Sequence, residues 1–521
     1  MHIQRNIGWS IVFVLAVWLT ACSRTGSDLV AQIDSGQLQG TVIDDVTVFK
    51  GIPFAAPPVG QWRWRPPQPV EPWPGVRPAH TYGAFCAQPK STLLWFQLGE
   101  VSEDCLTLNV WTPDFDPGAD LPVMVWIHGG GFSQGSGNIA RLNSPEVAKQ
   151  GVVLVTINYR LALFGFMTHP AITASHPDEP AGNYGLLDAV AALQWIQRNI
   201  AAFGGDPGNV TIFGESAGAG VVNHLMVMSN SAGLFHRAIS QSSSTGIAPR
   251  AVIDRRAGFE PSGEAVAIKF VEKLGVADSE DIASTLRSMT TEELLAGMGE
   301  RDRFTPVVEG NIIPDQLGFL YAEGKQHKVP YMNGGVSWEA SLGRLIGGGF
   351  SPEFAAKLVP PVDQARLYPG LSGEALEDRI FGDLIIMSGS RHIANSMFAI
   401  GAPVYSFYFT YVPEARRGKQ PGVAHADDIA FVMRTLETER DLMGAITDRD
   451  QEVAALISAY WVQFAKTGNP NGPGRPEWPE YDPETARVLE IGDEVIVHED
   501  FLAERMDYHL KRAWDLLERS R

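Results

Sequence analysis

The feature that most constrains the fold is the stretch of residues 209–220, where a short apolar run leads into Gly214-Glu215-Ser216-Ala217-Gly218. The β-branched and aromatic residues 210–213 favour a strand, and small residues suited to a closely packed helix follow. A serine between such a strand and helix has a strained backbone, and glycines two positions before and after it let the two elements approach. We therefore predict a sharp strand-to-helix turn that exposes the Ser216 hydroxyl at the carboxyl end of a sheet.

Long apolar runs elsewhere predict a mostly parallel sheet that is buried on both faces. Residues 121–128 and 152–157 are nearly continuous apolar runs of this kind, and residues 185–204 carry a helical apolar face that ends at two glycines. Alternating strands and helices of this type define a doubly wound α/β fold. Further strands are expected at residues 329–333, 404–411 and 495–498, edge hairpins at 29–50, Pro-rich coil at 53–78, and helical cap insertions at 252–303 and 340–400.

The N-terminus has the pattern of an export signal. Arg5 precedes an apolar run at residues 7–19, which is too short to span a membrane and ends in Leu-Thr-Ala-Cys22. This ending resembles the lipobox of bacterial lipoproteins. We expect a signal peptide at residues 1–21, a lipidated Cys22, a linker at 22–28 and one domain over 29–521. An ordinary signal peptide with a chance cysteine is the alternative.

The expected location is therefore the cell envelope. Ser23 after Cys22 suits outer-membrane sorting with the protein facing the periplasm, and the lipid at Cys22 would be the only membrane contact. The formal net charge of −19 argues against nucleic acid or an anionic membrane surface as a partner. Without Cys22, Cys86 and Cys105 remain as an even pair in an exported chain, which predicts a disulfide worth about 3 kcal/mol.

A glycine run lies where one buried strand is expected to end. His128-Gly129-Gly130-Gly131-Phe132 follows the apolar run 121–128. A glycine run alone is typical of a flexible turn, but here several backbone N–H groups can converge on one point. The position upstream of Ser216 indicates an oxyanion hole, with Gly130, Gly131 and Ala217 as donors.

A serine nucleophile needs a histidine base and an acid that orients it. Six histidines follow the serine turn and its helix: His236, His327, His392, His425, His498 and His509. His425 is favoured because it lies in a loop just after the expected strand 404–411. Glu339 follows the expected strand 329–333, but Glu309 and Asp383 also satisfy the order serine, acid, histidine that is typical of α/β-hydrolases.

Further segments resemble the type-B carboxylesterase and cholinesterase family over nearly the whole mature length. The matching segments are residues 49–60, 102–110, 128–132, 183–188, 203–210, 214–218, 464–471 and 478–481. The resemblance implies an α/β-hydrolase fold with helical insertions, Ser216 as nucleophile, Glu339 as acid and His425 as base. It also implies the Cys86–Cys105 bridge.

One departure and three candidate substrate contacts accompany this resemblance. The family usually has Asp-Glu-Gly around its acid, whereas this chain has Trp338-Glu339-Ala340. Glu215 beside the serine is typical of the family. Trp95 lies at the offset of the choline-stacking tryptophan of cholinesterases, although loop packing is the more ordinary role for it. Trp95, Phe132 and Glu215 are the expected substrate contacts.

The sequence thus predicts a serine carboxylesterase that acts on small-molecule esters through an acyl-enzyme. The chemistry requires no metal and no organic cofactor. Activity is expected to fall as the pH drops through roughly 6–7, since His425 must be neutral. Amide, carbamate or lactone hydrolysis by the same triad is an alternative, and a non-catalytic binding protein on this fold is a more distant one.

Overall fold

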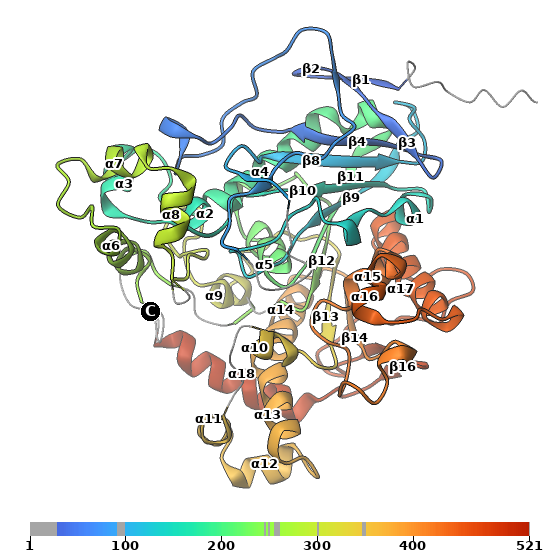
Figure 1. Cartoon of the computed structure of the whole chain (residues 1–521). Helices are drawn as coiled ribbons and strands as arrows, with labels where there is room; N and C mark the ends of the chain where they lie inside the picture. The colour runs from blue at the N-terminus through green and yellow to red at the C-terminus, as the bar shows by residue number, and fades with distance from the viewer. Residues whose placement is uncertain are drawn as a thin grey trace, which may run out of the picture.

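The computed structural model describes residues 29–90, 99–243, 246–247, 251–254, 261–299, 302–345 and 351–519. An 11-stranded sheet with helices on both faces lies at the centre (Figure 1). In spatial order its strands are β16 (Val495–His498), β15 (Val488–Ile491), β14 (Val404–Phe409), β13 (Tyr331–Val336), β12 (Arg237–Gln241), β11 (Gly205–Glu215), β9 (Leu121–Ile127), β10 (Val153–Ile157), β8 (Thr107–Thr112), β4 (Val46–Pro53) and β3 (Thr41–Ile43).

The centre of this sheet is parallel and its two edges are antiparallel. All neighbouring pairs from β10 to β15 run parallel, whereas β16 at one edge and β8, β4 and β3 at the other pair antiparallel. The chain passes from β9 to β10 on one side and then returns to β11 on the other side of β9. Such a change of direction opens a crevice at the carboxyl ends of the strands. The expected α/β class with a mostly parallel sheet is confirmed.

Each face of the sheet contributes to its own core, as the alternation along β9 shows. Val123, Val125 and Ile127 pack in one core with α4 (Tyr184–Asn199), α5 (Ala217–Leu225) and α14 (Ser388–Ala399). Met124 and Trp126 pack in the other core with α1 (Pro145–Ala148), α15 (Asp428–Val432) and α17 (Asp448–Thr467). A strand with apolar residues on both faces is the reason that the sequence shows an unbroken apolar run there.

The remaining helices surround this centre. Their bounds are α1 (Pro145–Ala148), α2 (Ala162–Phe166), α3 (Pro170–Ser175), α6 (Gly263–Lys273), α7 (Ile282–Ser288), α8 (Thr291–Gly297), α9 (Leu317–Ala322), α10 (Ser341–Leu345), α11 (Pro352–Leu358), α12 (Pro361–Leu367), α13 (Gly373–Gly382), α15 (Asp428–Val432), α16 (Arg440–Met443), α17 (Asp448–Thr467) and α18 (Ala503–Glu518). A π-helical turn, η7 (Asp383–Met387), joins α13 to α14, and α18 packs on both η7 and α14. In their described residues, both segments expected as insertions consist mainly of helices.

The N-terminal strands differ from the expectation. Of the two hairpins formed by residues 29–50, only β3–β4 belongs to the edge of the main sheet. The other, β1 (Val30–Ile33) with β2 (Gly36–Gln39), forms a separate sheet with β5 (Val76–Pro78), inside the stretch that was expected to be coil. Alternation predicts a strand but cannot identify its partner, and β5 ends on a proline, as a short edge strand can.

A second small sheet pairs β6 (Phe85–Cys86) with β7 (Val101–Ser102).

None of the helices in the described ranges is long and apolar enough to cross a bilayer.

Candidate active site

Ser216 lies between β11 and α5 in the strained geometry that the glycine pattern predicts. Its φ and ψ are 57° and −123°, a conformation that an L-residue rarely adopts. A Cβ at Gly214 would lie 2.6 Å from the carbonyl oxygen of Ile127, and one at Gly218 would lie 2.0 Å from the same oxygen. Any side chain at either position would push β9 away from the turn, so the two glycines are a steric requirement here.

The glycine run after β9 lies directly against this turn. A Cβ at Gly129 would be 2.7 Å from the carbonyl oxygen of Glu215 and 3.2 Å from Cβ of Ser216. Gly130 and Gly131 have φ values of 113° and 63°, which turn successive N–H groups out of the strand direction. β9 and β11 are parallel neighbours, so both loops leave the sheet at the same edge.

His425 and Glu339 form a buried pair at this edge. Nδ1 of His425 lies 2.6 Å from Oε2 of Glu339, and the residues are only 6% and 2% exposed. Glu339 follows β13, and His425 lies in the long connection after β14, the parallel neighbour of β13. Nε2 of His425 is buried and makes no hydrogen bond of ordinary geometry in the described part of the chain, although Oε1 of Glu215 lies 3.1 Å from it. A histidine whose Nδ1–H is bound to a carboxylate has its Nε2 lone pair available for a proton.

Ser242 and a backbone amide hold the other oxygen of Glu339. The Ser242 hydroxyl donates to Oε1 at 2.7 Å, and the Val336 N–H donates to the same oxygen at 2.8 Å. Ser242 follows the end of β12, which lies between β11 and β13. Sequence reasoning missed this residue, and its only signal was the run of hydroxyl residues at 242–245, directly after a buried strand.

The loop that carries Glu339 is also hydrogen-bonded to the loop that carries His425. Trp338 N–H donates to the carbonyl of Val423 at 2.9 Å, and the hydroxyls of Ser337 and Ser341 accept from the N–H groups of Val423 and His425, each at 2.8 Å. The two serines flank Glu339, so one short segment fixes both the carboxylate and the backbone of the histidine. These serines were also missed.

The other candidate acids lie in different surroundings. Glu309 accepts hydrogen bonds from the N–H groups of Asn311 and Ile313 in its own turn. Asp383 pairs with Arg505 and accepts a hydrogen bond from Tyr368. Neither carboxylate contacts His425.

The other candidate histidines are likewise engaged elsewhere. His236 accepts from the Val210 N–H, His327 contacts Ser231, His392 contacts the Gly318 carbonyl, His498 contacts Glu490 and His509 contacts Tyr368.

Glu215 brings a second carboxylate to the histidine. Its Oε1 lies 3.1 Å from Nε2 of His425, and its side chain is almost fully buried. Burial raises the pKa of Glu215, although the charge of His425 opposes this. Burial alone would lower the pKa of His425, but Glu215 and Glu339 together raise it above its ordinary value. The imidazolium is therefore stabilised by carboxylates on both of its nitrogens.

A third acid, Asp428, lies one turn beyond His425. It is completely buried and accepts a hydrogen bond from Nε2 of Gln241 at 2.6 Å, while Oε1 of Gln241 accepts from Trp461 at 3.0 Å. Burial raises the pKa of Asp428 to about 6. Its charge adds to the field that favours a protonated His425.

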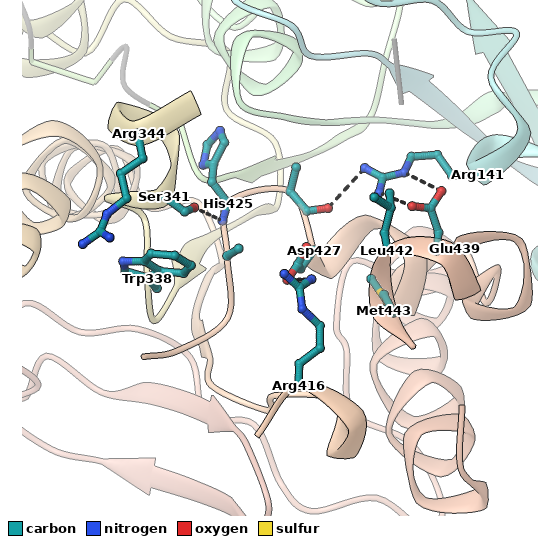
Figure 2. A pocket seen from close by; sticks show the side chains of 12 residues that line it. Arg141, Trp338, Ser341, Arg344, Arg416, His425, Asp427, Glu439, Leu442 and Met443 are labelled. Carbon is teal, nitrogen blue, oxygen red and sulfur yellow. Dashed lines mark hydrogen bonds and ion pairs between the residues drawn. The ribbon is translucent and has the colours of Figure 1, made fainter. Parts of the chain in front are cut away.

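A cavity of about 280 Å³ borders the histidine loop on its other side. Figure 2 shows the His425 ring pointing away from Trp338 and Arg416, two of the lining residues. Arg141 reaches this loop as well, because its guanidinium pairs with Glu439 and donates to the carbonyl of Ala426 at 3.5 Å. The loop residues Ala424, His425 and Ala426 all line this cavity, while the His425 ring points away from Trp338 and Arg416 on its far side (Figure 2).

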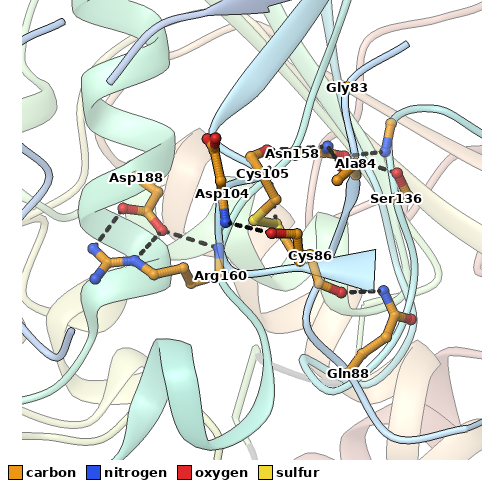
Figure 3. The surroundings of a disulfide bond; sticks show 12 residues. Gly83, Ala84, Cys86, Gln88, Asp104, Cys105, Ser136, Asn158, Arg160 and Asp188 are labelled. Carbon is orange, nitrogen blue, oxygen red and sulfur yellow. Dashed lines mark hydrogen bonds and ion pairs between the residues drawn. A yellow bond between two sulfur atoms is a disulfide. The ribbon is translucent and has the colours of Figure 1, made fainter. Parts of the chain in front are cut away.

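The structure contains the predicted disulfide, and of the expected substrate contacts it describes Phe132 and Glu215 but not Trp95. Cys86 and Cys105 are bonded, which confirms the predicted bridge (Figure 3). Trp95 and Cys22 lie outside the described residues. Phe132 is 4% exposed and its ring packs edge-to-face on Phe166 at 5.7 Å, so it is part of the core beneath the glycine run. A group of His, Cys, Asp and Glu suited to a metal ion is absent from the described ranges.

Comparison with known proteins gives consistent matches. The model of the carboxylesterase family matches residues 27–347 and 372–509. The fumonisin B1 esterase of Sphingopyxis macrogoltabida is 33% identical over 94% of this chain and 91% of its own length. The para-nitrobenzyl esterase of Bacillus subtilis (strain 168) is also 33% identical, over 89% of this chain and 95% of its own. A solved PNB esterase superimposes with a TM-score of 0.80 at 32% identity, covering 92% of this chain and 99% of that one.

The sheet, the serine turn and these structural neighbours define an α/β-hydrolase. Within that class the chain belongs to the carboxylesterase family, and the relatives reported above are named as esterases.

Proposed function

We propose that the protein is a serine carboxylesterase that works through an acyl-enzyme on Ser216. The observation that carries this proposal is the His425–Glu339 pair at 2.6 Å. Its free Nε2 lies 3.1 Å from the carboxylate of Glu215, the residue directly before Ser216. A histidine that is oriented by an acid, and whose other nitrogen faces the residue directly before a strained serine, fits the arrangement that nucleophilic hydrolysis requires.

The first half of the reaction acylates the enzyme. Nε2 of His425 takes the proton of Ser216 as Oγ attacks the ester carbonyl, and Glu339 stabilises the imidazolium. The carbonyl oxygen becomes negative and is bound by the N–H groups of Gly130, Gly131 and Ala217, each worth about 3–4 kcal/mol in the transition state. The C–O bond to the alcohol breaks, and His425 returns the proton to the departing alcohol.

The second half releases the acid. His425 takes a proton from water as the hydroxide equivalent attacks the acyl carbon, and the same amides bind the new oxyanion. The bond to Oγ breaks and the proton returns to Ser216, which restores the free enzyme. Glu215 and Glu339 both favour the imidazolium, the form of His425 that accompanies each tetrahedral intermediate.

The names of the relatives suggest the first substrates to try. One relative is named for fumonisin B1 and another for p-nitrobenzyl esters, and the second name makes an ester of an aromatic alcohol a reasonable probe for this chain. Chromogenic p-nitrophenyl acetate and butyrate add a comparison of acyl length.

The test compares the wild-type enzyme with Ser216→Ala on these esters. We expect wild-type turnover and a loss of at least about 10⁴-fold in kcat for the variant. Folded wild-type protein that hydrolyses none of these esters and does not react with a small organophosphate would contradict the proposal and favour a binding protein. Preference for a matched amide, carbamate or lactone over the ester would keep the triad and change the substrate class.

We also propose that Cys22 anchors the enzyme in the cell envelope through a lipid. The support is the apolar run that ends in Leu-Thr-Ala-Cys22. Metabolic labelling with an alkyne fatty acid should mark the full-length protein, and Cys22→Ser should abolish the label and release active enzyme from membranes. An unlabelled wild-type protein in the soluble fraction would contradict the anchor.

A further inference from the structure

We propose that Gln88 is a positioning residue for the oxyanion hole. Its carboxamide, anchored next to the Cys86–Cys105 disulfide, fixes the peptide of Gly135 and thereby the donor amides of Gly130 and Gly131. The inference rests on the proposed function, because it assigns a support to the oxyanion hole of that mechanism.

The first support is a two-bond clamp between one side chain and one backbone residue. Oε1 of Gln88 accepts the N–H of Gly135 at 2.9 Å, and Nε2 donates to the carbonyl of the same glycine, also at 2.9 Å. Nε2 donates in addition to the carbonyl of Cys86 at 2.8 Å. The glutamine is only 4% exposed, so water does not compete freely for these bonds. The planar amide supplies an acceptor and a donor side by side, so it satisfies the N–H and the C=O of one residue at the same time.

The second support is the close packing of Gly135 on the glycine run. Gly135 has a φ of 110°, and a Cβ there would lie 2.3 Å from the carbonyl oxygen of Gly129 and 2.5 Å from Nδ1 of His128. A Cβ at Gly130 would lie 2.1 Å from the carbonyl oxygen of Gln134. The backbone of residues 134–135 is therefore in direct contact with the backbone of the oxyanion loop. Moving Gly135 must move Gly129 and Gly130 as well.

Hydrogen bonds within the turn close the same loop from inside. The N–H groups of Ser133 and Gln134 both donate to the carbonyl of Gly130, at 3.1 Å and 3.0 Å. These bonds fix the peptide plane that follows Gly130, which is the plane that carries the N–H of Gly131. Gln88 holds the outer side of this turn, so the turn is fixed on two sides.

The third support is that Gln88 has a rigid base. Cys86, two residues earlier, is bonded to Cys105, and the intervening Ala87 N–H donates to the carbonyl of Ser102 at 2.9 Å. The carbonyl of Cys105 accepts from Asn158, whose Oδ1 accepts from both the Ser136 hydroxyl and the Gly137 N–H. Figure 3 shows Gln88 and Asn158 around the disulfide. The residues on both sides of the turn are thus connected to one covalent bridge.

The consequence for catalysis is specific. An oxyanion hole acts on a charge that exists only in the transition state, so a small displacement of its amides lowers kcat and leaves KM nearly unchanged. Replacing Gln88 by an apolar side chain of similar length would leave the N–H and C=O of Gly135 buried without partners, and the turn would shift to find new ones.

The experiment measures kcat and KM for Gln88→Met on p-nitrophenyl butyrate. We expect kcat to fall about ten- to a hundredfold with KM within about twofold. Affinity for an aryl trifluoromethyl ketone, which forms a tetrahedral oxyanion on the serine, should fall by the same factor as kcat/KM. The concentration of folded active sites is titrated with an organophosphate, so a loss of folded protein is not counted as a loss of rate.

Asn471 provides a matched control elsewhere in the fold. Its amide clamps Trp478 in the same way, accepting from the N–H at 2.7 Å and donating to the carbonyl at 2.8 Å. Asn471→Leu should lower thermal stability and leave kcat per active site unchanged. If both variants lower kcat equally, Gln88 has only a structural role and the inference is overturned.

Gln88→Glu adds a pH readout that a structural role would not produce. A protonated carboxyl can accept from the Gly135 N–H and donate to its carbonyl, as the amide does, whereas a carboxylate repels that carbonyl. The ratio of variant to wild-type kcat should therefore rise as the pH falls. A ratio that does not change with pH, or an undiminished kcat in Gln88→Met, would overturn this inference alone. A folded but inert wild-type enzyme would overturn the proposed function, and this inference with it.

Discussion

Two buried clusters in this molecule each contain a histidine, a carboxylate and a hydroxyl, yet their chemistry differs. In the first, His425 binds Glu339 directly and has its other nitrogen free beside the residue before Ser216. The second cluster includes His509 of α18. There the Tyr368 hydroxyl donates to Asp383 at 3.0 Å and lies 2.6 Å from Nε2 of His509. From the sequence alone, Asp383 and His509 were candidates for the acid and base.

The two clusters differ in whether a positively charged side chain pairs with the carboxylate. Arg505 donates to Asp383 from Nε at 2.8 Å, and its guanidinium lies 4.7 Å above the Tyr368 ring. With that charge balanced, burial dominates and lowers the pKa of His509 to about 4. Around His425 no described arginine or lysine pairs with Glu339 or Glu215, so both carboxylates raise its pKa. Whether a buried histidine can transfer a proton therefore depends on what its second nitrogen and its carboxylate face, and not on the residue types alone.

The largest expected effect comes from deleting each histidine. His425→Ala should lower kcat about 10⁴-fold or more, because the general base is lost. His509→Ala should leave kcat nearly unchanged and lower the free energy of unfolding by about 1–3 kcal/mol, because Tyr368 loses a buried partner. Steady-state kinetics and urea unfolding of both variants check this. Equal losses of activity would remove the distinction between the clusters.

Neutralising each carboxylate is expected to have the next largest effect. Glu339→Gln should cost about 10³–10⁴-fold in kcat, because the amide cannot stabilise the imidazolium. Asp383→Asn should leave kcat unchanged while lowering the free energy of unfolding by about 2–3 kcal/mol, because Arg505 loses its counter-ion. Activity and melting temperature are measured on the same preparations. An active Glu339→Gln beside an inactive Asp383→Asn would show that the acid is misassigned.

Removing one hydroxyl from each cluster has a smaller effect. Ser242→Ala deletes one of two hydrogen bonds to Oε1 of Glu339 and should lower kcat about tenfold, the equivalent of one hydrogen bond to a charged group. Tyr368→Phe should not change kcat. If Ser242→Ala retains full activity, the Val336 N–H alone is sufficient to orient the acid.

The smallest expected effect is a shift of the pH profile. His425 must be neutral to accept a proton, and its raised pKa means that activity is lost as the pH falls through a value above 6.5. This places the acidic limb of kcat/KM higher than the sequence suggested. Glu215→Gln removes one negative charge, lowers the pKa of His425 and should move the limb down by about one unit. A wild-type limb at or below 6.5, or no shift in the variant, would contradict the conclusion that Glu215 and Glu339 raise the pKa of His425.

From the residues alone, the features that could be predicted are formed by neighbouring positions in the sequence. The contacts that were missed join residues far apart in the sequence. The serine turn follows from sterics within five residues, and an unbroken apolar run such as that of β9 is visible without a structure. Ser242, Ser341 and Gln88 act on residues 97, 84 and 47 positions away, and no spacing rule reaches that far. For the same reason spacing could not exclude Asp383, whose charge is balanced by Arg505, 122 positions further on.

The most direct test of the account is covalent labelling of the full-length enzyme with a fluorophosphonate, followed by peptide mapping. The account predicts one probe per chain, attached to Ser216, with labelling slowed by several orders of magnitude in His425→Ala and unchanged in His509→Ala. A folded, esterase-active protein that is labelled on another residue, or not labelled at all, would contradict the claim that Ser216 is the nucleophile.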